Sequence, residues 1–441
     1  MRHIMWVLRV CAITAGLSLV SQSAQANTMS ASTRPPLKIS AQNSAQPVSF
    51  DARPPVRTQV PSQAQTVSSD AGLQLWITEF KPRAVAQGID LSVLDRALRD
   101  VNYDAKIIKR DRNQSEFTKT IWDYLSTAVS DLRIKNGKAA LQKHAEIFEQ
   151  VEAKYGVEKE FVAAIWGLES AYGTFRGSDS VIRSLTTLAY DGRRGEFFEG
   201  ELIAALKILQ NGDTSAQNMT GSWAGAMGHT QFIPTSFLAH AVDFDGDGRR
   251  DIWSDDPQDA IASTAAYLAH FGWEKGTPWG VEVTIPDSFD YLLANRDIAK
   301  SPQEWANLGI TGTHGSIKNY GPASILLPAG GDGAAFMIFG NFEVLESYNT
   351  ADAYVIGVGH LSDRIKGGAA IKSGWPFDDN ALTLKQREDM QRLLTAKGFD
   401  TDGIDGKIGP KTVNAVRAYQ VSEGLRPDGY ASPALVNRLQ R

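Results

Sequence analysis

A single carboxylate stands in an apolar stretch of the sequence, FVAAIWGLESAYG, which runs from Phe161 to Gly173. Apolar residues recur there at helical spacing, and Gly173 is suited to end the helix. Glu169 would then lie in the last turn, near the negative end of the helix dipole, and we expect its pKa to be raised. A carboxylic acid kept neutral in this way could protonate a glycosidic oxygen. The alternative is a Glu169 that faces solvent or pairs with Arg176.

A second stretch combines small residues with polar and aromatic ones: GSWAGAMGHTQFIPTSF, residues 221–237. Its three glycines would let the backbone approach a ligand closely. Ser222 and Gln231 could form hydrogen bonds with a polar substrate, and the aromatic residues could stack on sugar rings. The alternative is a tight packing corner with no ligand.

The third stretch, DFDGDGRRD, begins at Asp243 and resembles the first half of a calcium-binding loop. Asp243, Asp245 and Asp247 occupy positions one, three and five, and a glycine for the sharp turn occupies position six. Arg249 at position seven would contribute its backbone carbonyl. A Ser stands at position twelve, where the motif requires a bidentate Glu, so Asp255, Asp256 or Asp259 could complete the set of ligands if the loop is longer. The alternative is an acidic turn without metal, which is also our interpretation of DTDGIDG (400–406).

These stretches need a scaffold, and the sequence around them predicts one that is mainly helical. Helical periodicity is clear in AALQKHAEIFEQVEAKYG (139–156) and DAIASTAAYLAHFGW (259–273). WGVEVTIP (279–286) and AAFMIFGNFEVLESYN (334–349) are less regular and are compatible with short strands. KGGAAIKSGWPFDDNA (366–381) has the composition of a linker. The final segment contains a weak repeat, DGKIGPKTVNAV (405–416) and DGYASPALVNRL (428–439), in which each proline is expected near a helix start.

The beginning of the sequence has the features of a targeting segment. MRHIMWVLR carries two arginines, VCAITAGLSLV is a short apolar run, and SAQA offers small residues for cleavage after Ala26. Arg9 lies two residues before Cys11, which does not fit a lipoprotein signal. We therefore expect an exported protein that is not lipidated and whose mature form has no transmembrane segment. The alternative is an N-terminal membrane anchor. Residues 27–70 are rich in Ser, Gln, Ala and Pro and are expected to form a disordered linker.

The bulk composition limits the classes of function. The 441 residues suffice for two or three domains, and the net charge of −5 gives no reason to expect a nucleic-acid partner. Cys11 is the only cysteine, so an intramolecular disulfide is impossible.

Taken together, these stretches resemble the membrane-bound lytic murein transglycosylase B family. IWGLESAYG is similar to its catalytic-glutamate segment, and the stretch 221–237 is similar to its substrate groove. DFDGDGRRDIW resembles its calcium loop. EFTKTIWDYLSTAVSDLRI (116–134) and ESYNTADAYVIGVGHLSDRI (346–365) resemble its early and closing motifs. The final segment resembles the helical peptidoglycan-binding domain of many cell-wall enzymes.

The resemblance implies a mainly α, lysozyme-like catalytic domain with a groove and minor β content, followed by a small C-terminal helical module. The expected order is a signal peptide (1–26), a linker (27–70), the catalytic domain (71–366), a second linker (367–380) and the peptidoglycan-binding domain (381–441). It also implies a periplasmic enzyme that acts on peptidoglycan glycan strands, with cell-wall synthesis or division proteins as candidate partners.

The implied reaction cleaves the bond between N-acetylmuramic acid and N-acetylglucosamine without water and leaves anhydro-muramoyl ends. By matched position, Glu169 would act as acid and then as base. The implied substrate-binding residues are Ser222, Met227, Gln231, Phe232, Tyr267, Tyr348, Asn349 and Tyr354. The implied ligands of a structural Ca²⁺ are Asp243, Asp245, Asp247, Arg249 and Asp259. No organic cofactor is implied. A hydrolytic muramidase and a non-catalytic wall-binding protein are the alternatives.

Overall fold

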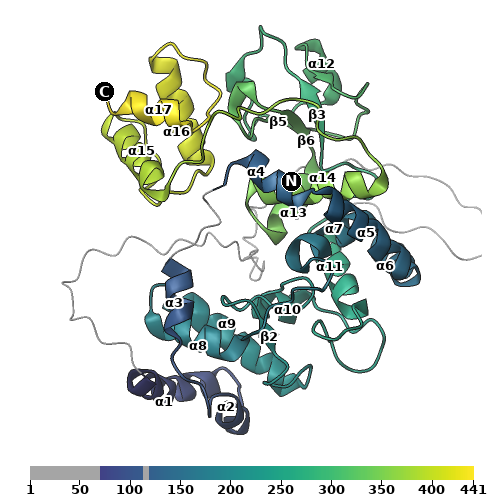
Figure 1. Ribbon diagram of the computed structural model, residues 1–441, viewed down its shortest axis with the longest axis vertical. Coiled ribbons are helices and arrows are strands. Elements are labelled where there is room, and N and C mark those ends of the chain that lie inside the picture. Colours follow the sequence, from purple (N-terminus) through teal and green to yellow (C-terminus); the bar gives the residue numbers. More distant parts are fainter. Residues whose placement is uncertain (1–69, 113–118) are drawn as a thin grey trace, which may run out of the picture. The chain divides into compact units, whose positions relative to one another are not determined.

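The computed structural model describes residues 70–112 and 119–441. The predicted signal peptide and nearly all of the first predicted linker lie outside these ranges. Asp70, which the sequence placed at the end of that linker, is the first residue of helix α1 (Asp70–Ala86), and its Oδ1 accepts a hydrogen bond from the backbone N–H of Tyr103. The described chain is mainly helical with two small sheets, which confirms the predicted fold class (Figure 1).

One group of helices surrounds the antiparallel pair α8 and α9 (Figure 1). Leu185 and Leu202, one from each of these two helices, are completely buried. The members of the group are α1, α2 (Leu91–Ala97), α3 (Ala105–Arg112), α8 (Val181–Asp191), α9 (Gly195–Asn211) and α10 (Pro234–His240).

The helix that carries Glu169 is α7 (Lys159–Ser170), and residues 161–167 are all buried. It packs against four neighbours in the second group of helices, α5, α6, α11 and α14 (Figure 1). This burial on every side explains why the apolar residues of α7 are not confined to one stripe. The group consists of α4 (Ile121–Ala128), α5 (Asp131–Lys143), α6 (Ala145–Tyr155), α7, α11 (Gln258–His270), α13 (Gly340–Tyr348) and α14 (Asp352–Lys366).

The structure divides one predicted helical stretch in two. The periodic segment 139–156 crosses the end of α5 and the whole of α6, with a break at His144, whose φ of −114° and ψ of 32° are not helical. The apolar period continues through the break because both helices bury apolar residues against the same group of helices, α5 against α7 and α6 against α11 and α7.

The two sheets differ in size and place. Strands β1 (Asp179–Ser180) and β2 (Thr220–Gly221) form a short antiparallel pair beside the start of α8. The larger sheet has the order β4-β3-β6-β5 and is antiparallel throughout. Its strands are β3 (Gly280–Thr284), β4 (Thr311–Gly312), β5 (Ser324–Leu326) and β6 (Ala335–Ile338). Strands β3 and β6 confirm the short strands expected in 279–286 and at the start of 334–349.

This larger sheet has an apolar core of its own, separate from the main one. Trp305, on the short helix α12 (Pro302–Asn307), is completely buried in it, and its indole N–H donates to the carbonyl of Ala323. The connections also contain the short 3₁₀ turns Tyr291–Leu293 and Gly330–Asp332.

The second predicted linker is not helical, but it is held against the protein. The Glu282 carboxylate of β3 accepts hydrogen bonds from the backbone N–H groups of Lys372 and Ser373. Trp375 and Phe377 lie against Trp122 of α4, with ring centroids 6.3 and 6.1 Å from it. The segment therefore behaves as a bound strap rather than a free tether.

The C-terminal module consists of α15 (Leu384–Ala396), α16 (Pro410–Ser422) and α17 (Pro433–Leu439). Both prolines of the predicted repeat begin a helix, as expected. The two halves also share an internal contact. The side-chain oxygen of Gln391 accepts from Gly406 N–H, and that of Gln420 accepts from the equivalent Gly429 N–H. The repeat is therefore structural, because a buried glutamine holds the Asp-Gly turn in each half.

Within residues 70–112 and 119–441, no helix combines the length and the apolar character that a membrane crossing requires.

Candidate active site

Helix α7 ends earlier than the sequence suggested, and its end is strained. The last helical residue is Ser170, not a residue next to Gly173. Ala171 and Tyr172 follow in the left-handed region, with φ values of 49° and 59°, and Gly173 continues there with a φ of 83°. Left-handed backbone costs about 1–2 kcal/mol for each non-glycine residue. Surrounding contacts must therefore hold this turn, which directly follows Glu169.

The side chain of Glu169 meets a tyrosine from a distant part of the chain. The hydroxyl of Tyr354, on α14, donates a hydrogen bond to Oε1 of Glu169 at 2.6 Å across a sequence separation of 185 residues. Burial and the negative charge of Glu169 raise the pKa of Tyr354 well above its usual value. Tyr354 therefore remains protonated and is a permanent donor to the Glu169 carboxyl.

The alternative partner considered for Glu169, Arg176, is engaged elsewhere. Its guanidinium pairs with Asp255 at 2.8 Å and donates to the backbone carbonyls of Trp253 and Ser254. Arg176 thus belongs to a separate polar network behind the active-site helix.

An aromatic cluster extends from Tyr354. The ring of Tyr348 stacks on that of Tyr354 with 6.4 Å between centroids and an interplanar angle of 7°. Tyr267 and Phe232 continue the cluster, 5.0 and 5.8 Å from Tyr348. The Tyr348 hydroxyl donates to the carbonyl of Thr230, and the Tyr267 hydroxyl donates to that of Ser347. These bonds fix the rings, and Phe232, Tyr267 and Tyr354 are at most 7% exposed, so the cluster is a rigid and largely buried wall.

A small cavity of about 40 Å³ opens beside this cluster. Four of the predicted substrate-binding residues, Gln231, Phe232, Tyr267 and Tyr348, line it together with Ile233, Ser236 and Ser347. Met227 is not in the lining and is completely buried. The structure therefore places Met227 in the core behind this wall. Asn349 ends α13, and its side-chain oxygen accepts from the backbone N–H of Ala351.

The glycines of the stretch 221–237 are needed for close packing of the backbone, independently of any ligand. A Cβ at Gly221 would lie 2.1 Å from the carbonyl oxygen of Ala226, and one at Gly228 would lie 2.3 Å from that of Ile252. Ser222 uses its hydroxyl to accept from Ala226 N–H, which closes the same corner. The two expectations for this stretch are thus compatible, since a tight corner presents the polar residues.

Gln231 has an unusual backbone conformation that its own side chain supports. Its φ is 53°, and its amide nitrogen donates to the carbonyls of Arg176 and Gly228 at 3.0 and 2.9 Å. These contacts orient the amide and connect the stretch 221–237 to the turn after α7.

The acidic loop forms the cluster that its spacing predicts. The carboxylates of Asp243, Asp245 and Asp247 are exposed, and one oxygen from each lies within 4.8 Å of the others. Asp243 accepts hydrogen bonds from the N–H groups of Gly246 and Gly248, which folds the loop around the cluster. Gly248 has a φ of 89°, as the sharp turn requires. Three carboxylates arranged on such a loop suit the oxygen preference of Ca²⁺.

Asp259 does not join the three clustered aspartates. It is only 4% exposed at the start of α11, and its two oxygens accept from the backbone N–H groups of Phe244 and Asp251, both at 2.7 Å. Burial, together with the charges of Asp245 and Asp243, raises its pKa to about 6. Asp259 therefore braces the two ends of the loop from within the protein, and its role as a direct Ca²⁺ ligand stays a prediction.

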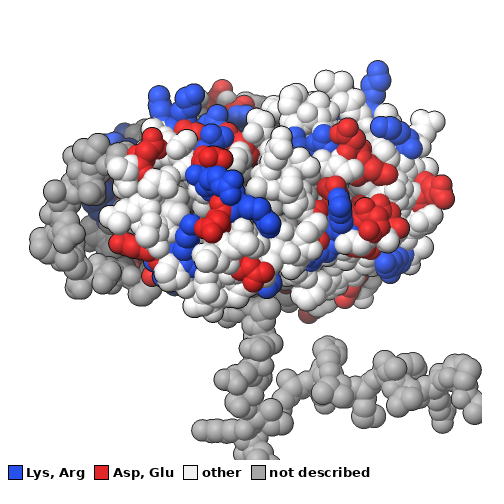
Figure 2. All heavy atoms as spheres, turned by 90° about the horizontal axis from the view of Figure 1, so that it is seen from below, with Lys and Arg blue, Asp and Glu red and all other residues white. Residues whose placement is uncertain are grey.

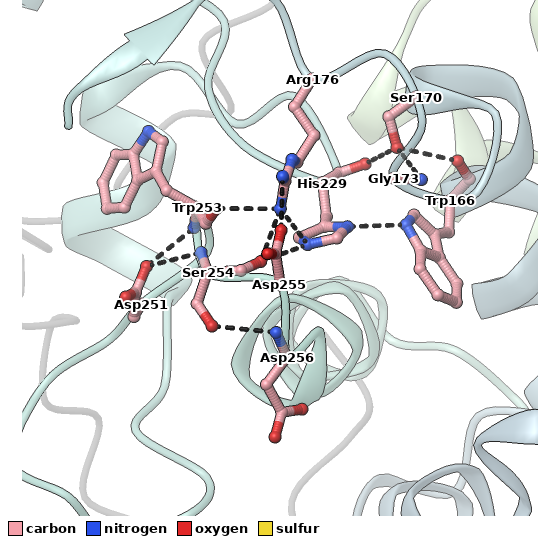
Figure 3. A network of polar contacts seen from close by, with 10 residues as sticks. All are labelled: Trp166, Ser170, Gly173, Arg176, His229, Asp251, Trp253, Ser254, Asp255 and Asp256. Atoms are coloured by element: carbon pink, nitrogen blue, oxygen red, sulfur yellow. Dashed lines mark hydrogen bonds and ion pairs between the residues drawn. The ribbon is translucent and has the colours of Figure 1, made fainter.

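A polar network behind α7 was not expected from the sequence (Figure 3). His229 lies at its centre and is 3% exposed. Its Nδ1 is 3.0 Å from the indole nitrogen of Trp166, and its Nε2 is 2.7 Å from the carbonyl oxygen of Ser254. The sequence offered two weak signals: a single histidine, His229, within a glycine-rich motif, and a tryptophan, Trp166, in an apolar helix where its indole N–H needs an acceptor.

Charge is mixed on the face of the molecule seen in Figure 2, where Lys and Arg alternate with Asp and Glu. Ion pairs of the described residues include Arg83 with Glu199 and Lys81 with Asp95. Such a face has no extended area of one sign.

Two family models match the chain, in the order that the sequence suggested. The model described as Transglycosylase SLT domain matches residues 72–363, and the one described as Putative peptidoglycan binding domain matches residues 383–439. The chain is also 30% identical over 249 residues to membrane-bound lytic murein transglycosylase B of Escherichia coli K12. That alignment covers 55% of this chain and 66% of the relative.

Solved structures agree with these matches. SltB3 from Pseudomonas aeruginosa, in complex with NAG-anhNAM-pentapeptide, is 48% identical, with a TM-score of 0.80 over 84% of this chain and 99% of that one. The Escherichia coli lytic transglycosylase Slt35, in complex with calcium, is 27% identical, with a TM-score of 0.57 over 67% of this chain and 93% of that one. The likeness to SltB3 includes the C-terminal region, because it extends over 84% of the chain.

The first family model covers more than half of the chain, and SltB3 is matched over nearly its whole length. Together with the lysozyme-like fold and the C-terminal module, these matches lead to one conclusion: the chain belongs to the SLT-domain transglycosylases of the SltB type, a family of enzymes that degrade peptidoglycan.

Proposed function

We propose that this enzyme cleaves the bond between N-acetylmuramic acid and N-acetylglucosamine in peptidoglycan and that Glu169 acts first as acid and then as base. The observation that carries this proposal is the 2.6 Å hydrogen bond from Tyr354 to Glu169 at the end of a buried helix. It gives one carboxyl a fixed orientation beside a rigid aromatic wall, which a residue that moves a proton requires.

The steps follow from what this carboxyl can do. In its neutral form Glu169 donates a proton to the glycosidic oxygen, and the bond from C1 of the muramoyl residue to that oxygen breaks. The resulting carboxylate is stabilised by the hydroxyl of Tyr354. It then accepts the proton of the muramoyl C6 hydroxyl while that oxygen bonds to C1. The product is an anhydro-muramoyl end, no water is consumed, and Glu169 is again neutral.

The neighbouring residues have roles in binding under this proposal. Phe232, Tyr267 and Tyr348 line the cavity, and because Phe232 and Tyr267 are at most 7% exposed they would bound the sugar site with small apolar edges and not with whole ring faces. Gln231 is oriented through its amide nitrogen, so its side-chain oxygen can accept from a sugar hydroxyl or N-acetyl N–H. Ser222 and Asn349 would act at the ends of the site, and Met227 would support it from the core.

Mass spectrometry of sacculi digested by the purified mature protein tests the reaction. We expect anhydro-muramoyl products from the wild-type enzyme and none from Glu169→Gln. Reducing muramoyl ends, which are heavier by one water, would instead identify a hydrolytic muramidase. A folded wild-type protein that binds sacculi without releasing products would identify a wall-binding protein.

We also propose that the acidic loop holds a structural Ca²⁺. The three clustered carboxylates and the backbone carbonyl of Arg249 would be ligands, and Asp259 would brace the loop behind them. The loop belongs to a different segment from Glu169, so the ion would stabilise the fold without entering the reaction. The likeness to Slt35, whose structure is a calcium complex, supports this proposal.

The place of action follows from the substrate. We propose that the chain is exported to the periplasm with cleavage after Ala26, that it is not lipidated, and that residues 381–441 bind peptidoglycan. N-terminal sequencing of the protein recovered from the periplasm should begin at Asn27. An uncleaved protein in the membrane fraction would contradict this.

A further inference from the structure

His229 contacts the end of α7 and the turn that follows Glu169 in two ways (Figure 3). Its backbone carbonyl accepts from the hydroxyl of Ser170, and the same hydroxyl accepts from the N–H of Gly173. Its ring accepts from the indole N–H of Trp166, one turn before Glu169 on α7. These contacts bracket Glu169 on both sides along the chain.

The protonation of the His229 ring follows from its partners. An indole N–H can only donate, so the Nδ1 atom that faces Trp166 carries no proton. The Nε2 atom of the neutral ring then carries the proton and donates to the carbonyl of Ser254 at 2.7 Å, while Nη1 of Arg176, 3.2 Å from Nε2, donates to the carbonyls of Trp253 and Ser254. Burial, and after it the charge of Arg176, lowers the pKa of His229, so this neutral form is maintained.

The ring is fixed from its far side as well. Arg176 donates to the same carbonyl of Ser254 and to that of Trp253, and it pairs with the exposed Asp255. On the near side the ring lies so close to the turn that a Cβ at Gly173 would be 2.5 Å from it. The ring therefore has a single position, between the segment 253–255 and the turn after α7.

We propose that His229 is a positioning residue for Glu169, acting through its ring contact with Trp166. It does not touch the substrate. Its ring holds the last turn of α7 in a fixed position relative to the strained residues Ala171 and Tyr172. The Glu169 carboxyl therefore stays within hydrogen-bonding distance of the Tyr354 hydroxyl. The inference rests on the proposed role of Glu169.

Two conservative variants separate the two sides of the ring. In His229→Asn the side-chain oxygen can occupy the place of Nδ1 and accept from Trp166. In His229→Gln the side-chain nitrogen can occupy the place of Nε2 and donate to Ser254, but nothing accepts from Trp166. His229→Phe keeps a flat ring without either contact, and Trp166→Phe removes the same hydrogen bond from the opposite partner.

The measurement is turnover of soluble glycan strands at a temperature well below the melting temperature of every variant, where all are folded. We expect kcat to fall about 10- to 100-fold in His229→Phe and in His229→Gln, with KM within a factor of two. His229→Asn should recover most of the lost kcat. The kcat of Trp166→Phe should equal that of His229→Gln. The double variant Trp166→Phe/His229→Gln should lose no more kcat than either single variant.

A second readout does not depend on activity. The indole N–H proton of Trp166, assigned in NMR spectra by its disappearance in Trp166→Phe, should be protected from solvent exchange in wild type and His229→Asn and unprotected in His229→Gln. Wild-type kcat in a folded His229→Phe would overturn the proposal. So would full activity in His229→Gln together with reduced activity in His229→Asn. If Glu169→Gln itself keeps wild-type activity, the proposed function fails instead, whatever the His229 variants do.

Discussion

The end of α7 and the acidic loop both present carboxylates, but they are built on opposite plans. At the end of α7 one carboxyl receives a hydroxyl from a residue 185 positions away and lies beside stacked rings. In the acidic loop three exposed carboxylates come from five consecutive positions and accept hydrogen bonds from their own backbone. The first site depends on the whole fold, whereas the second is nearly complete within its own segment.

This difference teaches how each site can be tuned. A group positioned by distant segments acquires its orientation from tertiary packing, which suits a residue that must transfer a proton. A loop that positions its own carboxylates can bind or release an ion without disturbing the rest of the protein. Changes at the first site should therefore affect turnover, and changes at the second should affect stability.

The largest effect is expected for Glu169→Gln. Removing the proton-transferring group should lower turnover of sacculi by about 100- to 10,000-fold. The melting temperature should change little, because the amide keeps the size of the side chain and can accept from Tyr354. Glu160→Gln, in the first turn of the same helix, is the matched control and should keep wild-type turnover. Retained activity in Glu169→Gln would refute the catalytic assignment.

Tyr354→Phe should have the next largest effect. Loss of the hydroxyl removes the hydrogen bond to Oε1 of Glu169, and we expect kcat to fall about 10- to 100-fold, because charge-assisted hydrogen bonds contribute about 1.5–3 kcal/mol. Steady-state kinetics on soluble glycan strands would measure this. Tyr103→Phe, in a tyrosine pair with Tyr190 on the other helical group, serves as control. Equal kcat in both variants would mean that the Tyr354 contact does not serve catalysis.

Asp243→Asn tests the other side of the comparison. The wild-type protein, stripped by a chelator, should gain several degrees in melting temperature when calcium is restored, because an ion that binds only the native state stabilises it. The variant should lose this gain while keeping turnover below its melting temperature. Asp402→Asn is the matched control and should keep the calcium response, since Asp402 lies in the other Asp- and Gly-rich segment, 400–406, where it pairs with Lys411. A calcium response that survives in Asp243→Asn would place the ion elsewhere.

The smallest effect concerns His360, a buried residue of α14. Burial, with the charge of Arg364 next, lowers its pKa to about 4. The unfolded chain therefore binds a proton near pH 6.5 that the native protein does not. Its contribution to stability is complete above pH 6.5 and is lost as the pH falls towards 4, by at most about 3 kcal/mol. Urea unfolding at pH 7.5 and 4.5 should show a smaller loss in His360→Gln; an equal loss would contradict this.

Local signals predicted much of this molecule. The alternating aspartates of 243–247 predicted the carboxylate cluster that they form. The segment 400–406 lacks that spacing, and its aspartates bind other side chains: Asp402 pairs with Lys411, and Asp405 accepts a hydrogen bond from Gln391. Pro410 and Pro433 predicted two helix starts. Such features depend on neighbours along the chain, so they are visible without a fold.

Features that depend on distant contacts were missed or came only through the resemblance. The pairing of Tyr354 with Glu169 joins two helices, and nothing local to either predicts it. At the early end of α7 the Ser170 hydroxyl donates to the carbonyl of His229, 59 residues away, and the role of Asp259 as a brace depends on where Phe244 and Asp251 lie. In each case the deciding partner belongs to another segment, so periodicity and spacing carry no information about it.

The strap at 367–380 is held in a way that bears on how its sequence can change. Glu282 accepts from the backbone N–H groups of Lys372 and Ser373, not from their side chains. Every amino acid except proline supplies that N–H. Relatives could therefore vary freely at these two positions and keep the C-terminal module at the same point of attachment, while a single proline at either would remove a hydrogen bond that holds it there.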